Sequence, residues 1–385
     1  MYNYIPLEQA ADILDSYRKP VNSKERLNLI KGKPLDELFP YYGATGQVGW
    51  IDSFLTDGEY ILLGEDGAPF LNPYAEKAYI IYGKTWVNNH AHILRSKTNN
   101  EFLCYYLNYF NYKNYVSGTT RLKLTQAQMR KIPIPNIPSD EQSRIVASIE
   151  ELFSELDKAV DTLKTTKEQL EVYRQTILVD AFRAATNSTY LKVGCVCAKI
   201  VDCPHSTPKW EKSGKLCLRT TNFKRGYLDL QSPNYVSEET FHDRNRRIIP
   251  QPGDVLYSRE GSVLGIACTI PSNVYPCLGQ RMMLLRSGKK LNNRYLMHYL
   301  NSPMVTNHVI ATKGGTGSPH INVGDIKEFQ IPIPSLEEQS NIVRQIEEQL
   351  SSCDNVEKTV DAILTQADAM RQSILKQAFE EEKEV

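Results

Sequence analysis

The sequence has no apolar run long enough to cross a bilayer, and its N-terminus has neither the basic region nor the apolar core of a signal peptide. A membrane-spanning helix needs about 18 consecutive apolar residues, and no segment of the 385 residues comes near that length. The eight cysteines are too sparse for a disulfide-stapled scaffold and are expected to be reduced thiols. These absences argue against membrane proteins and disulfide-rich secreted proteins, and they predict a cytoplasmic protein.

The sequence also lacks the motifs of common nucleotide enzymes. It contains no G-x-x-x-x-G-K-[ST] loop, so ATP turnover is not expected. Gly314-Gly-Thr-Gly317 precedes an extended segment and does not open a helix after a strand, which argues against a dinucleotide site. Asn72-Pro73-Tyr74 resembles part of the amino-methyltransferase signature but lacks its second proline, and we interpret it as a turn. No pair of carboxylates stands out as an acid–base couple, so we expect a chain that is not an enzyme.

Four side chains near the start of the second half could in principle bind zinc: Cys195, Cys197, Cys203 and His205. Their spacing is unusual for a closed structural site, and the first half has no counterpart. Buried thiols and a polar histidine are the favoured interpretation, and no bound metal is expected.

The net charge is zero, with 45 Lys and Arg against 45 Asp and Glu, which by itself argues against a nucleic-acid partner. Counted by segment, however, the net charge is +2 over residues 1–139, −4 over 140–186, +9 over 187–335 and −7 over 336–385. Alternating basic and acidic zones fit DNA-facing domains joined by connectors that face protein or solvent.

The chain is an internal repeat of two units. Ile132-Pro-Ile-Pro135 recurs as Ile331-Pro-Ile-Pro334, and a Glu-Gln-Ser-x-Ile-Val block at 141–146 recurs 197 residues later. An Arg-Gln-x-Ile-Leu block at 174–178 returns at 371–375 with the same offset. We interpret each unit as a variable domain of about 140 residues followed by a tail of about 45 residues in which the two copies match better.

The variable domains are predicted to be mixed α and β. Short apolar segments bounded by Gly, Asp or Pro are typical of strands, and they occur at Tyr60–Leu63, Tyr79–Tyr82, Asp254–Tyr257 and Arg281–Leu285. Helical spacing is present from Asn100 to Tyr109 and from Asn293 to Leu300, two segments that match each other across the repeat. We therefore expect an α+β fold with a curved sheet in each domain.

The tails are predicted to be long helices that pair as a coiled coil. Ser139 to Gln142 and Ser335 to Glu338 have the form of capping boxes. A heptad pattern over five repeats predicts a seam of two rows, with a surface helix over a globular core as the alternative. The first row contains Ile149, Leu156, Leu163, Leu170 and Ile177, with Ile346, Cys353, Val360, Ala367 and Ile374 in the second tail. The other row contains Ile145, Leu152, Ala159, Thr166 and Tyr173, with Ile342, Gln349, Val356, Ile363 and Met370.

Polar and basic residues gather in the predicted loops of both domains. Lys and Arg neutralise phosphates, whereas Arg, Asn, Gln and Glu can read base edges in the major groove; a solvated surface or strand packing remains the alternative. The candidate DNA contacts in the first domain are Tyr42, Thr45, Asp66, Asn89 and His90. Those in the second domain are His205, Arg219, Asn222, Arg259, Glu260, Gln280 and Arg281.

Together, the repeated blocks resemble the specificity subunit of type I restriction–modification systems. The resemblance covers essentially the whole chain, and its most specific part is the doubled helix signature described above. Further matches are Pro40-Tyr-Tyr-Gly-Ala-Thr-Gly46 with Glu65-Asp-Gly67, and Pro204-His-Ser-Thr-Pro208 with Pro252-Gly-Asp254.

The resemblance implies a non-catalytic subunit with target-recognition domains at 1–139 and 187–335, each reading one half of a bipartite, asymmetric DNA site. The helices at 140–186 and 336–385 would form an antiparallel coiled coil with a pseudo-two-fold axis, set the spacer and dock two methyltransferase subunits. Restriction–translocase subunits would join further out. Adenine-N6 methylation and ATP-dependent cleavage, with S-adenosylmethionine, ATP and Mg as cofactors, would belong to these partners.

Two other functions remain open from the sequence: a self-sufficient DNA methyltransferase or nuclease with divergent motifs, and a coiled-coil adaptor that does not bind DNA. The sequence also departs from the repeat at its start, where a short amphipathic segment around Leu7 to Tyr17 replaces a long helix. We therefore expect the C-terminal helix to complete the repeat circularly, with residues 1–30 packed near it.

Overall fold

The computed structural model divides the chain into two compact units, which are described separately. Unit 1 comprises Met1–Lys164 and Val360–Val385, and unit 2 comprises Thr165–Thr359. The structure describes residues 3–183, 185, 188–261, 263–312 and 319–380, so Gly314-Gly-Thr-Gly317 lies outside the described residues. Within the described residues no helix has the length and apolar character that a bilayer span requires.

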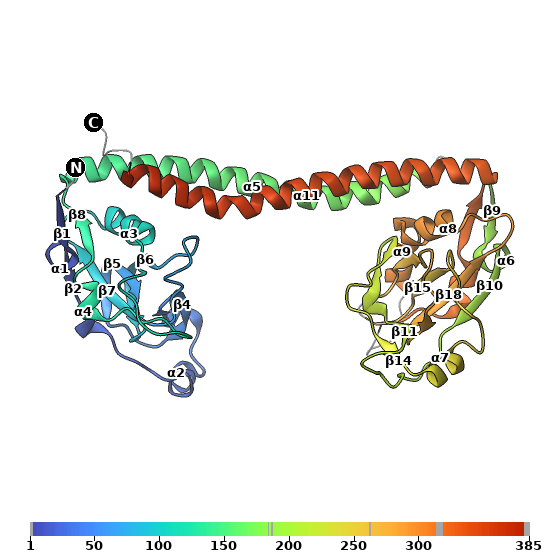
Figure 1. Cartoon of the computed structure of the whole chain (residues 1–385), viewed down its shortest axis with the longest axis horizontal. Coiled ribbons are helices and arrows are strands. Elements are labelled where there is room, and N and C mark those ends of the chain that lie inside the picture. Colours follow the sequence, from blue (N-terminus) through green and yellow to red (C-terminus); the bar gives the residue numbers. More distant parts are fainter. Residues whose placement is uncertain (1–2, 184, 186–187, 262, 313–318, 381–385) are drawn as a thin grey trace. The chain divides into compact units, whose positions relative to one another are not determined.

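The core of unit 1 is a six-stranded sheet in the order β2-β7-β5-β6-β3-β4. Strands β3 and β6 are parallel, and the other neighbours are antiparallel. Helix α3 lies between the sheet and the long helices (Figure 1). The elements are β1 Tyr4–Pro6, α1 Leu7–Ala10, β2 Ala11–Ile13, α2 Ser23–Ile30, β3 Phe39–Gly43, β4 Gly46–Ile51, β5 Thr56–Gly64, β6 Ala78–Val87, β7 Ala91–Ser96, α3 Asn100–Tyr109, α4 Gln126–Met129 and β8 Pro133–Pro135, with short 3-10 turns at Asp15–Tyr17 and Leu35–Glu37.

Unit 2 has a four-stranded sheet in the order β10-β18-β15-β16 and a three-stranded sheet in the order β14-β11-β17. Helices α8 and α9 lie between the four-stranded sheet and the long helices (Figure 1). The elements are β9 Thr189–Lys192, α6 Val193–Val196, β10 Cys197–Asp202, β11 Lys215–Leu218, β12 Phe223–Lys224, β13 Tyr227–Leu228, β14 Tyr235–Val236, α7 Glu238–Arg244, β15 Val255–Ser258, β16 Ala267–Thr269, β17 Cys277–Leu278, β18 Met282–Ser287, α8 Asn293–Asn301, α9 Pro303–Thr312, α10 Val323–Glu328 and β19 Gln330–Ile333, with a 3-10 turn at Thr220–Asn222.

The repeat seen in the sequence is also a repeat of topology. The order β2-β7-β5-β6 in unit 1 corresponds to β10-β18-β15-β16 in unit 2, and the small β1-β8 sheet corresponds to β9-β19. The register agrees as well, because Leu63 lies opposite His92 and Tyr257 lies opposite Met283. The predicted strands and the predicted helices α3 and α8 are all present, so the α+β expectation is confirmed.

The long helices α5 (Ser139–Arg183) and α11 (Leu336–Glu380) confirm the predicted tails. Each begins on one domain and ends in an aromatic anchor on the other. In unit 2, Phe182 of α5 is fully buried with its ring edge-on to Tyr295 and Tyr299 of α8. In unit 1, Phe379 of α11 packs in the same way against α3, beside Phe102. The C-terminal helix therefore completes the first unit, as the circular repeat predicts.

Only one of the two predicted heptad rows forms the helix seam. The row that begins at Ile149 is buried or half-buried, but most of the other row is exposed, including Leu152, Tyr173, Val356, Ile363 and Met370. The second seam row instead lies four residues after the first and contains Phe153, Val160, Lys167 and Arg174 in α5, with Leu350, Glu357, Leu364 and Arg371 in α11. The prediction was wrong because it required apolar residues at positions where the two helices pair charged side chains.

Two local predictions at the N-termini also need correction. Ser335 and Glu338 form the expected capping box, with Glu338 N donating to Ser335 Oγ at 3.2 Å and Ser335 N donating to Glu338 Oε2 at 2.9 Å. The first box does not form, because the Gln142 side chain turns inward and donates to Ile137 O. The segment around Leu7 is not one amphipathic helix but a sequence of short elements, β1, α1, β2 and a 3-10 turn.

Candidate nucleic-acid interface

In unit 2 the structure brings most of the predicted contact residues together at one edge of the sheet. Arg259 and Glu260 follow the end of β15, and Arg281 precedes the start of the neighbouring strand β18. The Arg259 backbone N–H donates to Arg281 O at 3.1 Å. The Gln280 amide donates to His205 O at 2.6 Å, which joins the loop after β10 to the same edge.

Arg259 is held inside this edge by an ion pair. Its guanidinium contacts both carboxylate oxygens of Asp202, with Nε and Nη2 donating at 2.8 and 3.0 Å. Its side chain is only 9% exposed. His205, whose side chain is 66% exposed, lies 3.1 Å from the same carboxylate. Arg259 is therefore placed to support the edge, whereas His205 is open to a ligand.

Arg281 and Glu260 form the exposed layer above this pair. Their side chains are 53% and 29% exposed, and Arg281 Nε lies 3.8 Å from Glu260 Oε1. Arg281 has a φ of +66°, in the left-handed region that is uncommon for residues other than glycine. Backbone conformations of this kind cost about 1–3 kcal/mol and cluster at functional sites.

A small cavity of about 280 Å³ opens beside Arg281. The Arg219 guanidinium stacks over the Trp210 ring, 5.4 Å from its centroid. Stacking fixes the plane of the guanidinium and leaves its edge available for hydrogen bonds. The lining residues are Thr207, Pro208, Trp210, Arg219, Thr220, Gln280 and Arg281.

Asn222 is a predicted contact that is buried and hydrogen-bonded within its own loop. It is 6% exposed. Its Oδ1 accepts from Arg219 N at 2.8 Å, and its Nδ2 donates to Asp229 O at 3.0 Å. Asn222 thus shapes the loop that carries Arg219, and its amide groups are already satisfied.

In unit 1 the corresponding edge also gathers predicted residues. Asp66 contacts His90 Nδ1 at 2.6 Å and Arg121 Nη2 at 2.7 Å. Asn89, beside His90, is exposed, as is Thr45 in the turn between β3 and β4. These residues come from the loops after β5, before β7 and between β3 and β4.

Tyr42 is the predicted contact of unit 1 that lies deepest. It is half-buried in β3, and its ring lies 6.0 Å from that of Tyr79. Burial raises the pKa of the Tyr42 hydroxyl. A groove of about 800 Å³ begins nearby and is lined by Asn22, Arg26, Tyr41, Val48, Asn89 and His90, among others.

A buried charge network lies under the exposed residues of unit 1. Glu65 accepts from Arg18 at 2.5 Å, and the fully buried His92 contacts Asp15 at 2.7 Å. Burial opposes ionisation of Asp15 and Glu65, but hydrogen bonds from His92 to Asp15 and from Arg18 to Glu65 outweigh it and lower the pKa of each carboxyl. Both carboxylates are therefore charged at neutral pH and fix the strand ends from which Asp66 and His90 project.

Sequence reasoning missed three side chains at these edges: Arg26, Arg121 and Trp210. Arg121 lies in the basic stretch Arg121-Leu-Lys123, which could have been singled out by charge. Arg26 stacks on Tyr41 at 5.0 Å, and Trp210 lies beneath Arg219. Each of the two stacked arrangements joins residues of different elements or loops, and no motif in the sequence marks them.

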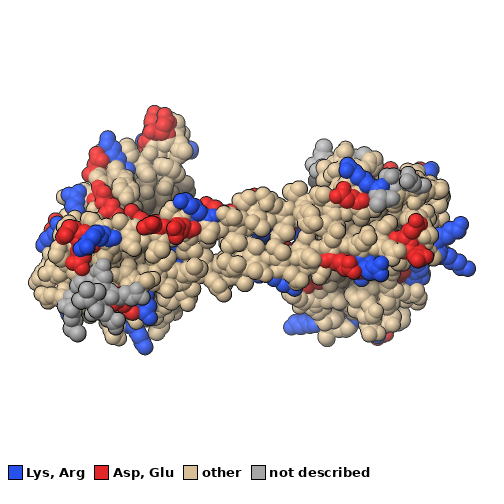
Figure 2. Space-filling model, turned by 90° about the horizontal axis from the view of Figure 1, so that it is seen from above, with Lys and Arg blue, Asp and Glu red and all other residues tan. Residues whose placement is uncertain are grey.

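The face that carries the long helices is not a single basic surface. Figure 2 shows acidic and basic side chains intermingled over both domains on this face. The net positive charge of residues 187–335 is therefore not gathered there.

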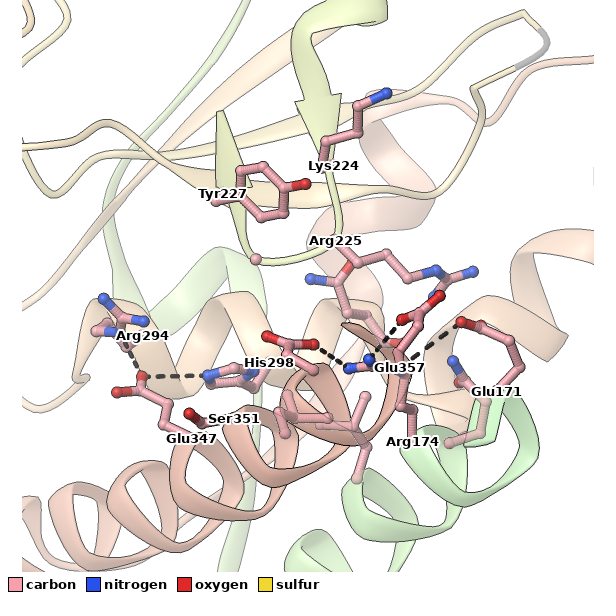
Figure 3. A pocket seen from close by; sticks show the side chains of 16 residues that line it. Glu171, Arg174, Lys224, Arg225, Tyr227, Arg294, His298, Glu347, Ser351 and Glu357 are labelled. Atoms are coloured by element: carbon pink, nitrogen blue, oxygen red, sulfur yellow. Dashed lines mark hydrogen bonds and ion pairs between the residues drawn. The ribbon is translucent and has the colours of Figure 1, made fainter. Parts of the chain in front are cut away.

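The helix pair of unit 2 borders a cavity of about 500 Å³ (Figure 3). Arg174 crosses between the helices and contacts Glu357 at 2.9 Å and Asp354 at 2.6 Å. On the opposite side, the buried His298 lies 3.3 Å from Glu347, which is also paired with Arg294. Acidic residues of the helices thus face the basic β12–β13 turn across the cavity, and the contacts of Glu347 with α8 attach the helix pair to its domain.

The structure also bears on the possible zinc ligands and on the predicted turn at Asn72. Among the described residues, no three His, Cys, Asp or Glu side chains lie together as a metal ion would require. Asn72 Oδ1 accepts from Tyr74 N at 3.0 Å, so Asn72-Pro73-Tyr74 is a turn, as expected.

Comparison with known proteins defines the class to which these paired domains belong. The family described as "Type I restriction modification DNA specificity domain" matches residues 9–172 and again residues 205–366. The chain belongs to this family and contains two copies of its domain. Its function is accordingly that of a specificity subunit of a type I restriction–modification system.

Individual relatives agree with this assignment. The chain is 29% identical over 350 residues to a putative type I restriction enzyme specificity subunit, S.HindORF215P, of Haemophilus influenzae, a match that covers 88% of this chain and 85% of the relative. The crystal structure of the HsdS subunit from Thermoanaerobacter tengcongensis has the same fold, with a TM-score of 0.56 at 19% identity, covering 98% of this chain and 96% of that one. A chain from a study of complex assembly and conformational transition of the type I R-M system has a TM-score of 0.67 at 18% identity, with coverage of 98% and 97%.

Proposed function

We propose that each domain reads one half of a bipartite, asymmetric DNA site and that the chain itself catalyses no reaction. The observation that carries this proposal is the equivalence of the two sheet edges. Both present polar and charged side chains from the same strand ends, but the side chains differ between the domains, as reading two different half-sites requires. The recognition domains correspond to residues 1–139 and 187–335, joined by the helical segments 140–186 and 336–385.

The exposed and half-buried side chains at these edges are the proposed DNA contacts. In the first domain they are Thr45, Asp66, Asn89 and His90, with Tyr42 behind them. In the second they are His205, Arg219, Glu260, Gln280 and Arg281. Arg259 and Asn222 are proposed to support these contacts, because their polar groups already bind within the protein.

The proposed partners are taken from the family to which the chain belongs. We propose that the subunit acts in the cytoplasm with two methyltransferase subunits and with restriction–translocase subunits. Adenine-N6 methylation and ATP-dependent cleavage, with S-adenosylmethionine, ATP and Mg, are assigned to those chains. The exposed apolar row on the helix pair supports a protein partner at Tyr173 in unit 2 and at Met370 in unit 1, two positions related by the 197-residue offset.

Mapping methylated adenines across a genome, with and without this chain, tests the function. We expect one bipartite motif that depends on the chain and on its methyltransferase partner. Duplex binding by the assembled complex is expected to weaken steeply with salt, since it depends on phosphate contacts. Methylation by the purified chain alone would overturn the non-catalytic assignment, and binding insensitive to both salt and sequence would favour a protein adaptor.

A further inference from the structure

We infer that one pair of a carboxylate and a basic side chain in each domain is the main point of base discrimination: Asp66 with His90 in unit 1, and Glu260 with Arg281 in unit 2. We call these the outer pairs. The inference rests on the proposed DNA-reading function and goes beyond it by naming, in each domain, the two positions whose chemistry decides the half-site.

The outer pairs are equivalent in the fold. Asp66 lies two residues after β5 and Glu260 two residues after β15, while His90 and Arg281 each directly precede the antiparallel neighbour strand. The same backbone hydrogen bond joins the two segments in both domains. Glu65 N donates to His90 O at 2.7 Å, and Arg259 N donates to Arg281 O at 3.1 Å.

Behind each outer pair lies an ion pair that is less exposed, which we call the inner pair. In unit 1 it is Glu65 with Arg18, at 2.5 Å, and in unit 2 it is Arg259 with Asp202, at 2.8 Å. The residue on the first strand end is acidic in one domain and basic in the other. Both domains therefore have an ion pair at this position, although the acidic and basic residues have exchanged places. The inner pair fixes the strand end that carries the outer-pair residue proposed to contact the bases.

The outer pairs have the exposure that base contact requires. The exposed fractions of His90 and Arg281 are 40% and 53%, against 16% and 9% for Arg18 and Arg259 of the inner pairs. Arg281 also has a strained left-handed backbone, of the kind that clusters at functional sites. An exposed basic side chain on a fixed strand end can contact DNA without first being ordered.

The chemistry of the outer pair in unit 2 indicates its target. Arginine donates two hydrogen bonds to guanine O6 and N7, and a glutamate accepts from cytosine N4 in the major groove. Arg281 and Glu260 together therefore match one G·C pair or two adjacent pairs that contain guanine and cytosine. In unit 1 Asp66 lies against His90 Nδ1, which leaves the Nε2 side of the ring to face a different base.

The test uses the full complex with its methyltransferase and a duplex library randomised at every position of the site. For Arg281→Gln we expect a loss of discrimination of about 10- to 100-fold at one guanine of the half-site read by unit 2. The other half-site and the spacer should remain unchanged. The corresponding variant in unit 1, His90→Gln, should alter only the half-site read by that unit. The matched control is Arg246→Gln, since Arg246 is an exposed arginine of the same domain that pairs only locally with Asp243.

Arg281→Lys distinguishes base reading from a phosphate contact. Lysine keeps the positive charge but loses the forked geometry, so the base preference should be lost while the salt dependence persists. An unaltered motif with a uniformly weaker affinity in both Arg281 variants would overturn the inference. If the wild-type complex gave no bipartite motif, the proposed function itself would fail, which is a separate outcome.

Discussion

Arg174 Nη1 of α5 lies 2.6 Å from Asp354 Oδ1 of α11, and the same contact is repeated in unit 1 by Arg371 of α11 and Asp157 of α5. Both residues of the second contact are offset by 197 from those of the first. Each arginine begins a copy of the Arg-Gln-x-Ile-Leu block. The most specific repeat in the sequence therefore encodes an ion pair between the two helices.

The Arg174–Asp354 contact should contribute measurably to the stability of unit 2. We expect a double-mutant cycle of Arg174→Met and Asp354→Asn to give a coupling free energy of about 1 kcal/mol, since Arg174 is only 16% exposed. The control is the same cycle at Lys192 and Glu328, an exposed pair of unit 2 whose side chains are 48% and 63% exposed. Urea unfolding in low and high salt measures both. Equal coupling free energies in the two cycles would show that the interhelix pair stabilises unit 2 no more than an exposed surface pair does.

Lengthening the helices should lengthen the DNA spacer. One heptad inserted after Lys164 in α5 and one after Thr359 in α11 would keep the seam in phase and leave both interhelix ion pairs intact. Seven residues add about 10 Å of helix, or about three base pairs. A methylation map of this variant should show a longer spacer between unchanged half-sites. An unchanged spacer would contradict a role of the helices as a ruler.

The exposed apolar row should bind the methyltransferase subunits. Met370→Asp in unit 1 and Tyr173→Asp in unit 2 place a charge on side chains that are 49% and 52% exposed. We expect each substitution to remove one methyltransferase from the complex and the double substitution to remove both, as measured by light scattering of the assembled complex. Gln366→Asp, on an exposed position of the same helix, is the matched control. Full assembly by the double variant would place the docking surface elsewhere.

Acid should destabilise unit 1 through Asp15. The pKa of this carboxyl is lowered from its ordinary value of 3.8, so its contribution is fully present above that value and is lost as the pH falls through the lowered pKa. In Asp15→Asn that contribution is absent at every pH. We expect the stability gap between the two proteins to be constant above about pH 5 and to narrow below about pH 4. Parallel curves over the whole range would show that Asp15 is not the responsible group.

Much of the architecture could be predicted because it depends on local and periodic signals. The alternation of β5 puts Ile61 and Leu63 on one face and Tyr60 and Leu62 on the other, and the structure buries them in two separate clusters. The helical spacing of Asn100 to Tyr109 likewise predicts α3 with the bounds that the structure shows. Such patterns need no knowledge of distant contacts.

The candidate interface was harder to predict from the sequence. Asp66 and His90 were both proposed, but nothing local shows that they form a pair or that Arg281 and Glu260 are their counterparts. Asn222 and Arg259 have the residue types of base readers, yet their partners Asp229 and Asp202 occupy their polar groups. Residue type therefore indicates which side chains can contact DNA, and only their partners decide which are free to do so.

The sequence by itself determined the repeat, the two long helices and the alternating charge, because each is a property of spacing or composition along the chain. The tertiary structure decided which helix faces meet. Apolarity alone favoured the row with Met370 and Tyr173. The seam instead contains Arg174 and Arg371, because each forms an ion pair with a carboxylate on the opposite helix. A charged side chain is tolerated at a helix contact when its partner is present, and here that partner lies on the other helix, about 200 residues away in the sequence.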